Sequence, residues 1–273
     1  MGLDFQDQSQ SAKQMIDESN KILGFDLFEV MCKASAEDLQ QTKVTQPAIF
    51  LYSLLKLQES DQIFEAVAGH SLGEFTALVA NGVLSFSDAM RLVRIRANAM
   101  QKACEQNPGT MAAILGLEDQ VVESVCEQVD GIVVPANYNC PGQLVISGEL
   151  KAVEQACELA TEAGAKRALI LPVGGAFHSP LMKPAEDELA AEIETLQFND
   201  AKVPVYQNIV AKAVSDANEI KNNLIKQLTG PVKWHQSILQ MKADGFDEYA
   251  EIGPGKTLRG LVLKIDRQLS FVS

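Results

Sequence analysis

The sequence predicts an α/β protein with a mostly parallel sheet and a smaller subdomain inserted into it. At 273 residues, 47% of them hydrophobic, the chain is long enough for a large core together with an insert. Outside residues 108–175, helical patterns alternate with short apolar runs, which is typical of a parallel sheet. Within residues 108–175 the order becomes β-α-β-β-α-β, the ferredoxin-like arrangement. We therefore expect a large α/β subdomain over residues 1–107 and 176–273 and a small one over residues 108–175.

The first helix is expected just before Gly24, because small and apolar side chains share one helical face and glycine favours a helix end. The residues on this face are Ala12, Met15, Ile16, Ser19 and Ile22. A second helix is expected from Pro47 to Gln58, with proline in its first turn. The apolar run Ile63–Ala68 ends at a glycine and predicts a short buried strand.

The small subdomain is expected to contain four strands and two helices. The strand signals are short runs rich in apolar side chains, and the helix signals are longer amphipathic stretches. The expected strands are Met111–Leu117, Ile132–Ala136, Leu144–Ser147 and Ala168–Val173. The expected helices are Asp119–Val129 and Leu150–Ala163. A ligand would then lie between the two subdomains, where clefts usually form.

Composition excludes several classes of function. The 36 acidic and 23 basic residues give a net charge of -13, and such a surface repels phosphate backbones, so a nucleic-acid partner is not expected. The five cysteines are odd in number and never arranged as C-x-x-C, which argues against disulfides or a zinc site and favours a reducing compartment. Because no apolar run reaches 18 residues, we expect a cytoplasmic protein without a membrane segment.

The segment Gly69–Gly73 matches the G-x-S-x-G pattern of a nucleophile elbow, with Ser71 at its centre. An apolar run precedes it and the helical run Glu74–Ala80 follows, which is the strand–turn–helix setting that this pattern needs. The glycines would permit the sharp turn that lifts the serine hydroxyl from the sheet. The same turn would aim the backbone N–H of Leu72 at a developing oxyanion. The other interpretation is an ordinary glycine-flanked turn with a capping serine.

A serine hydroxyl needs a base, and the chain has three histidines to supply one. His178 comes after an expected strand and just before helix-start signals, Ser179 as cap and Pro180 at the first helical position. The positive end of that helix would favour neutral imidazole, the form that a general base requires. His235 ranks second, since an esterase would carry its histidine late in the chain. His70 is expected to be structural.

Arg96 lies in an expected helix over Asp88–Cys104 and points to its apolar side. At about 100° per residue, it falls about 140° from Arg91, which lies on the polar face. A guanidinium that cannot be neutralised needs a carboxylate or phosphate partner on an apolar side. Spacing alone leaves two alternatives, an internal ion pair and a bidentate clamp for a substrate carboxylate.

Six motifs in the order of this sequence resemble those of the malonyl-CoA:acyl-carrier-protein transacylases of bacterial fatty acid synthesis. They are Thr45–Pro47, Gly69–Glu74, Arg96 within 94–101, Asn137–Gln143, Ala176–Met182 and Glu251–Lys256. The resemblance covers essentially the whole chain. It implies a hydrolase-like α/β core with a ferredoxin-like insert. It also implies malonyl-CoA and an acyl carrier protein as partners, with coenzyme A as part of a substrate and no cofactor or metal. A monomer is expected.

The resemblance also implies a ping-pong transfer through a malonyl ester of Ser71. His178 would act as base and then acid, held by the backbone carbonyl of Gln227 instead of an aspartate. Arg96 matches the arginine that pairs with the malonyl carboxylate, which favours the clamp. Leu72 would supply an oxyanion N–H, and Asn139 is carried over only as a candidate substrate contact.

One departure from the family pattern and three competing functions accompany this resemblance. Family members usually begin with a strand and a Gly-Gln-Gly-x-Gln loop whose glutamine supplies a second oxyanion contact, whereas this sequence opens at Met1–Phe5. The large subdomain would then lack its first strand, and weakened catalysis is expected, because an oxyanion donor contributes about 10² to 10³ in rate. The competing functions are a polyketide-type malonyl acyltransferase, a simple esterase and a non-catalytic interaction protein.

Overall fold

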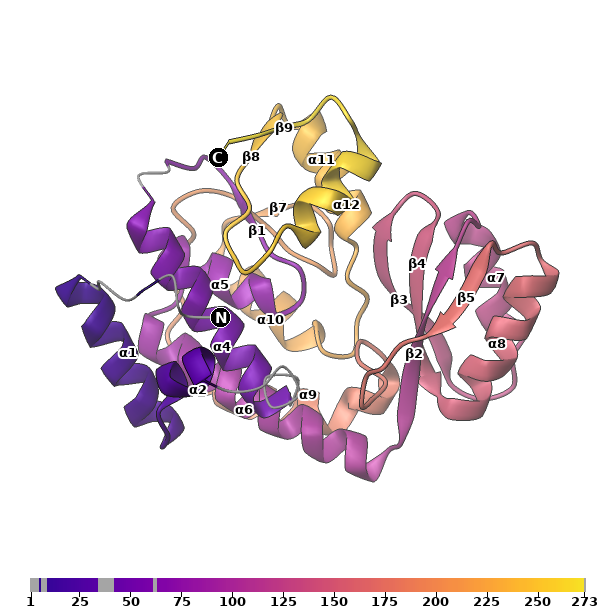
Figure 1. The fold of residues 1–273 in the computed structure, drawn as a ribbon, viewed down its shortest axis with the longest axis horizontal. Helices are drawn as coiled ribbons and strands as arrows, with labels where there is room; N and C mark the ends of the chain where they lie inside the picture. The colour runs from indigo at the N-terminus through magenta and orange to yellow at the C-terminus, as the bar shows by residue number, and fades with distance from the viewer. Residues whose placement is uncertain (1–4, 6–8, 34–41, 61–62, 273) are drawn as a thin grey trace.

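The computed structural model describes residues 1–273 except 1–4, 6–8, 34–41, 61–62 and 273. A larger part, made mostly of helices around short strands, adjoins a smaller part built on one antiparallel sheet (Figure 1). The first half of the larger part contains α1 (Gln10–Leu23), α2 (Leu27–Lys33), α4 (Thr42–Glu59), β1 (Val67–Ala68), α5 (Leu72–Ala80) and α6 (Phe86–Gln106). Its second half contains α9 (Lys183–Thr195), β6 (Val205–Tyr206), β7 (Ala213–Val214), α10 (Ala217–Lys226), α11 (Trp234–Ala243), β8 (Glu248–Tyr249), α12 (Thr257–Ile265) and β9 (Ser270–Phe271).

The helices of the first half form largely where the sequence predicts them. The hydroxyl of Ser9 caps α1 by accepting from the N–H of Ala12, and the helix ends at Gly24, whose φ of 80° suits glycine. The start predicted for the second helix is wrong, because α4 begins at Thr42 and Pro47 lies inside it. Proline removes one hydrogen bond of the second turn there. Burial of neighbouring Ala48, Phe50 and Leu51 in the core offsets that loss.

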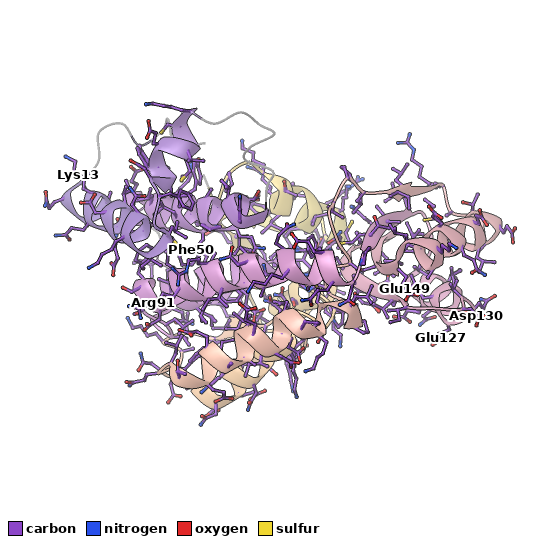
Figure 2. All side chains as sticks on the ribbon, turned by 90° about the horizontal axis from the view of Figure 1, so that it is seen from below. Lys13, Phe50, Arg91, Glu127, Asp130 and Glu149 are labelled. Atoms are coloured by element: carbon purple, nitrogen blue, oxygen red, sulfur yellow. The ribbon has the colours of Figure 1, made fainter. Side chains whose placement is uncertain are left out.

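Helix α6 is the central element of the larger part. Its apolar face packs into one core together with α4 and α9, and this core contains Phe50, Met90, Leu92 and Leu189, all fully buried. Figure 2 shows α6, which carries Arg91 near one end, running across the molecule towards the smaller part. Helix α6 ends at Gln106 and the first strand of the small sheet begins at Gly109, so the helix leads directly from the larger part into the smaller one.

The smaller part has the predicted order of elements. These are β2 (Gly109–Leu115), α7 (Asp119–Glu127), β3 (Val133–Cys140), β4 (Gln143–Glu149), α8 (Leu150–Glu162) and β5 (Arg167–Ile170). The strands form one antiparallel sheet in the order β3-β4-β2-β5. Helices α7 and α8 cover one face, and their apolar side chains share a core with Ile114, Leu144 and Ile146 of the sheet. The opposite face is directed towards the larger part (Figure 1).

The strands of the larger part are shorter than the sequence predicts. In the expected strand Ile63–Ala68, pairing begins at Val67, and Ile63 is 95% exposed. The strands form two small sheets, β1-β6-β7 and β8-β9; β1 pairs with β6 and β8 pairs with β9 in parallel, while β6 and β7 are antiparallel. Both β1 and β8 border one cavity of about 800 Å³.

No helix among the described residues is long and apolar enough to cross a membrane.

The smaller part is attached to the larger one at a second place besides α6. There Asn137 of β3 forms a parallel bridge with Val232, and the N–H of Tyr138 donates to the carbonyl of Val232 at 2.9 Å. Val232 closely follows Gly230, whose carbonyl contacts the candidate base described below.

Candidate active site

Ser71 occupies a sharp turn between β1 and α5, as the elbow pattern predicts. Its φ of 51° and ψ of -104° are unusual for a residue with a side chain. The turn requires glycine at position 69, because a Cβ there would lie 2.0 Å from the backbone carbon of Gly73. The chain therefore stores local strain at this serine, which is where functional sites tend to concentrate it.

His178 accepts a hydrogen bond from the hydroxyl of Ser71. The distance from Ser71 Oγ to His178 Nε2 is 2.8 Å. The other ring nitrogen, Nδ1, lies 2.9 Å from the carbonyl oxygen of Gln227 and 3.2 Å from that of Gly230. Because a carbonyl can only accept, Nδ1 carries the proton, and Nε2 has its lone pair free for the serine hydroxyl. This tautomer is the one that a general base needs.

Burial keeps His178 neutral. The side chain is 4% exposed, and desolvation lowers the pKa of His178 to about 3, with a further lowering from the positive charge of Arg96. The carbonyls of Gln227 and Gly230 oppose this shift only in part. At neutral pH the imidazole is therefore ready to take a proton from Ser71.

Arg96 lies beside the same hydroxyl and points inward, as the helical pattern predicts. Its side chain is 2% exposed and donates from Nη2 to Ser71 Oγ at 2.8 Å and from Nη1 to Gln46 Oε1 at 2.6 Å. The guanidinium carbon lies 5.6 Å from the ring centroid of Phe75. Desolvation lowers the pKa of Arg96 to about 10, while Glu74 raises it, so the group remains charged at neutral pH.

The charge of Arg96 has no carboxylate partner within ion-pair distance among the residues that the structure describes. The nearby carboxylate of Glu74 acts on it through space without a direct bond. Its Nε is also buried without a hydrogen bond in the same part of the chain. A buried cation with unfilled donors next to a nucleophile is suited to bind an anionic group of a substrate.

The backbone N–H of Leu72 opens helix α5 directly after Ser71. Within the described chain this N–H has no hydrogen-bond acceptor, whereas those of Gly73 and Glu74 donate to the carbonyls of His70 and Ser71. A free N–H at a helix N-terminus can stabilise negative charge that develops on a neighbouring carbonyl oxygen. The oxyanion role of Leu72 stays a prediction, with which this free N–H is compatible.

The other three residues considered from the sequence lie outside the cluster of Ser71, His178 and Arg96. Asn139 is 8% exposed, and its Oδ1 is 3.0 Å from Nε2 of His70, whose ring also contacts Trp234 at a centroid distance of 5.8 Å. His70 is thus held structurally. His235 faces Asp119, at 4.0 Å from its carboxylate, and makes no contact with Ser71.

Several residues that hold the site were not assigned a role from sequence. Gln46 contacts Arg96, Gly230 shares His178 with Gln227, and Asn208 contacts the backbone of Ser71 at 2.7 Å. Gln46 lies in the motif Thr45–Pro47, which could have drawn attention to it. Nothing in the local pattern around Asn208 points to the nucleophile, which is 137 residues away.

The cavity of about 800 Å³ lies next to the elbow. Its lining includes Gly69, His70, Leu72 and Gly73, with Asn139 from the smaller part, and Ser71, His178 and Arg96 are not among the lining residues. Among the described residues, no group of three or more histidine, cysteine, aspartate or glutamate side chains could hold a metal ion.

A strained serine, a neutral histidine and a helix N-terminus on an α/β scaffold define the class of serine acyltransferases and hydrolases. Residues 1–264 match the acyl transferase domain family, and the chain belongs to this family. It is 43% identical over 279 residues to the malonyl CoA-acyl carrier protein transacylase of Bacillus subtilis, covering 100% of this chain and 88% of that protein. The transacylase of the same name from Escherichia coli is 43% identical over 254 residues, covering 91% of this chain and 82% of the relative.

Solved structures give the same result. An acyl carrier protein S-malonyltransferase from Vibrio cholerae superposes with a TM-score of 0.94 at 42% identity, covering 100% of this chain and 91% of that one. A malonyl-transacylase solved in complex with a type II polyketide synthase acyl-carrier protein superposes with a TM-score of 0.91 at 38% identity, covering 95% of this chain and 86% of that one. The fold is therefore an α/β fold shared with these enzymes.

Proposed function

We propose that this protein transfers a malonyl group from coenzyme A to the phosphopantetheine thiol of an acyl carrier protein in fatty acid synthesis. The observation that carries this proposal is the buried guanidinium of Arg96, unpaired by any described carboxylate and 2.8 Å from Ser71 Oγ. A substrate of an esterase offers such a group nothing, whereas the free carboxylate of a malonyl thioester supplies the missing charge. The named relatives support the same substrate pair.

In the first half-reaction, His178 Nε2 takes the proton of Ser71 as Oγ attacks the thioester carbon. The carbonyl oxygen becomes an oxyanion that the N–H of Leu72 stabilises. The tetrahedral intermediate collapses by breaking the carbon–sulfur bond, and the imidazolium returns its proton to the coenzyme A thiolate. Ser71 is left as a malonyl ester, whose distal carboxylate pairs with Arg96.

The second half-reaction runs the same steps in reverse with a different thiol. His178 takes the proton of the phosphopantetheine thiol, and the sulfur attacks the malonyl ester carbon. The carbon–oxygen bond to Ser71 breaks, and the imidazolium protonates the released Oγ. The Gln227 carbonyl holds the ring throughout, because its bond to Nδ1–H persists in both protonation states of Nε2.

We also propose the finer description of the fold. Residues 1–107 and 176–273 form a hydrolase-like α/β subdomain, and residues 108–175 form a ferredoxin-like one, which the sheet order β3-β4-β2-β5 with two helices on one face supports. Asn139, at the border of the cavity, remains a candidate substrate contact. The protein would act as a cytoplasmic monomer without a cofactor.

A second candidate is malonyl transfer in polyketide synthesis, which the structural likeness to a transacylase bound to a type II polyketide carrier favours. The chemistry at Ser71 would be identical. The two functions differ in the carrier protein that discharges the malonyl enzyme fastest, so rates with a fatty acid carrier and a polyketide carrier would separate them.

The direct test incubates the protein with malonyl-CoA labelled with carbon-14 in the malonyl group and locates the label by peptide mass spectrometry. We expect one malonyl ester on Ser71, stable in water and discharged by a carrier thiol, and none in Ser71→Ala. Label that fails to attach to the unsubstituted protein would contradict the proposal. An ester that water discharges as fast as thiol does would favour the esterase alternative.

A further inference from the structure

The elbow is held by a side chain that comes from a distant segment. The amide of Asn208 accepts from the N–H of Ser71 at 2.7 Å and donates to the carbonyl of Gly69 at 2.6 Å. One side chain thus bridges backbone groups on both sides of His70. Asn208 is 1% exposed, so water does not compete for either bond.

Asn208 is itself fixed from behind by a buried carboxylate. Its own backbone N–H donates to Glu74 Oε2 at 2.8 Å, and Gln207 Nε2 donates to Glu74 Oε1 at 3.0 Å. Glu74 belongs to the first turn of α5 and is 1% exposed. The helix that follows the nucleophile and the segment that follows β6 are therefore joined by bonds that water does not reach.

A second amide holds the other side of the nucleophile. Gln227 donates from Nε2 to the carbonyl of Ser71 at 3.1 Å, while its own backbone carbonyl accepts from His178 Nδ1. The same residue therefore contacts both members of the Ser71–His178 pair. Together, the amides of Asn208 and Gln227 engage both the N–H and the carbonyl of Ser71.

We propose that Asn208, supported by the side chain of Gln227, is a positioning residue that holds Ser71 in its strained backbone conformation. At φ of 51° the residue would relax without outside bonds, and Oγ would move away from His178 Nε2. The N–H of Ser71 donates to Asn208 Oδ1, whereas the N–H of Leu72 has no acceptor among the described residues and is free to meet the oxyanion. Neither amide touches the serine hydroxyl or, by the proposed function, the substrate.

The consequence is measured by a reagent that reports on the elbow without any malonyl group. A fluorophosphonate reacts with an activated serine, so its second-order rate constant at Ser71 tests positioning independently of the proposed function. We expect Asn208→Ala to lower this constant about 10- to 100-fold, the loss typical of misplacing reacting groups by about 1 Å. The second measurement is the Kd of malonyl-CoA in a Ser71→Ala background, and it rests on the proposed function. Adding Asn208→Ala to this background should change the Kd by less than about threefold.

Asn223→Ala is the matched control, because it removes an amide of the same network one step further from the elbow. Asn223 donates from Nδ2 to Gln207 Oε1 at 2.9 Å and is 9% exposed. We expect its fluorophosphonate rate to stay within about threefold of that of the unsubstituted protein. Equal losses in Asn208→Ala and Asn223→Ala would show a general effect on stability and overturn the proposal.

Gln227→Met keeps the proposal testable if Asn208→Ala does not fold. This change preserves side-chain volume and the backbone carbonyl that holds His178, and it removes the bond to Ser71 together with the contact of the same amide with Glu74. We expect Gln227→Met to react with the fluorophosphonate about tenfold more slowly, with an unchanged pH profile. A rate equal to that of the unsubstituted protein would overturn the proposal. An Asn208→Ala protein that folds and reacts normally would overturn it as well. A protein that reacts with fluorophosphonate but never with malonyl-CoA would contradict the proposed function and leave the positioning ratios valid.

Discussion

Replacing Arg96 by alanine should convert a malonyl-selective enzyme into one that prefers a shorter, uncharged acyl group. The guanidinium is 2% exposed and lies 2.8 Å from Ser71 Oγ, so a malonyl ester on that oxygen would carry its carboxylate within a few ångströms of the charge. Two unit charges about 4 Å apart at an effective dielectric of about 20 interact by about 4 kcal/mol. At about 1.4 kcal/mol per tenfold, this corresponds to a loss of about 10³ in kcat/KM for malonyl-CoA.

Acetyl-CoA lacks the carboxylate and should show the opposite trend. In the unsubstituted protein an acetyl group leaves Arg96 buried without a partner, a cost that alanine removes. We expect the rate of acetyl transfer by Arg96→Ala to equal or exceed that of the unsubstituted protein.

The assay measures the rate of ester formation on Ser71 with each thioester by quenched flow, at equal protein concentration and with stability checked by urea denaturation. Arg91→Ala is the matched control, because this arginine lies on the same helix with a side chain 49% exposed and an ion pair to Asp88. Its two rates should not change, since surface pairs contribute about 0–1 kcal/mol. Equal losses with malonyl and acetyl groups in Arg96→Ala would refute the clamp and indicate a structural role.

Three further outcomes follow from the same geometry. Gln46→Glu would place a carboxylate against Arg96 Nη1, which now lies 2.6 Å from the amide oxygen of Gln46. Because this carboxylate competes with that of the substrate, it should lower kcat/KM for malonyl-CoA about tenfold or more and change acetyl transfer less. Equal effects on both substrates would count against such competition. Because the pKa of His178 is lowered to about 3 and its neutral form is the base, the rate of acylation should rise through about pH 3 and stay flat from pH 5 to 8. A rise centred near pH 6.5 would contradict this. Since Arg96 lowers the pKa of His178, Arg96→Ala should move the rise to higher pH. Gly69→Ala should abolish fluorophosphonate labelling and lower the free energy of unfolding by about 3 kcal/mol, because its Cβ meets backbone 2.0 Å away; a normally labelled, stable variant would show that the turn can relax.

The three candidate catalytic residues could be singled out because each leaves a local signal. Ser71 lies between glycines at the start of a helical run, and His178 precedes helix-start residues. The helical period alone placed Arg96 on the apolar side, and the structure buries it to 2% exposure. That it contacts Ser71 could not follow from spacing, because the contact joins α6 to the separate turn before α5.

The supporting residues left no such signal. Asn208 and Gln227 contact the nucleophile across 137 and 156 residues, and an amide in a loop or at a helix end has the same local pattern whatever it binds. The strand predicted over Ile63–Ala68 was too long for a related reason: apolar character indicates burial, but pairing depends on where the neighbouring strand β6 begins. Pro47 gave a wrong helix start because tertiary packing outweighed its local preference.

His178 is held by two carbonyl dipoles where many serine hydrolases have a carboxylate, and by the proposed function this would affect which molecule discharges the ester. Neutral dipoles stabilise the imidazolium less than an anion would, so the base has a weak affinity for protons. A thiol, with a pKa near 8.5, gives up its proton to such a base far more readily than water, with a pKa near 15.7. A weak base therefore favours exchange between sulfur carriers and protects the energy of the acyl bond from loss to solvent.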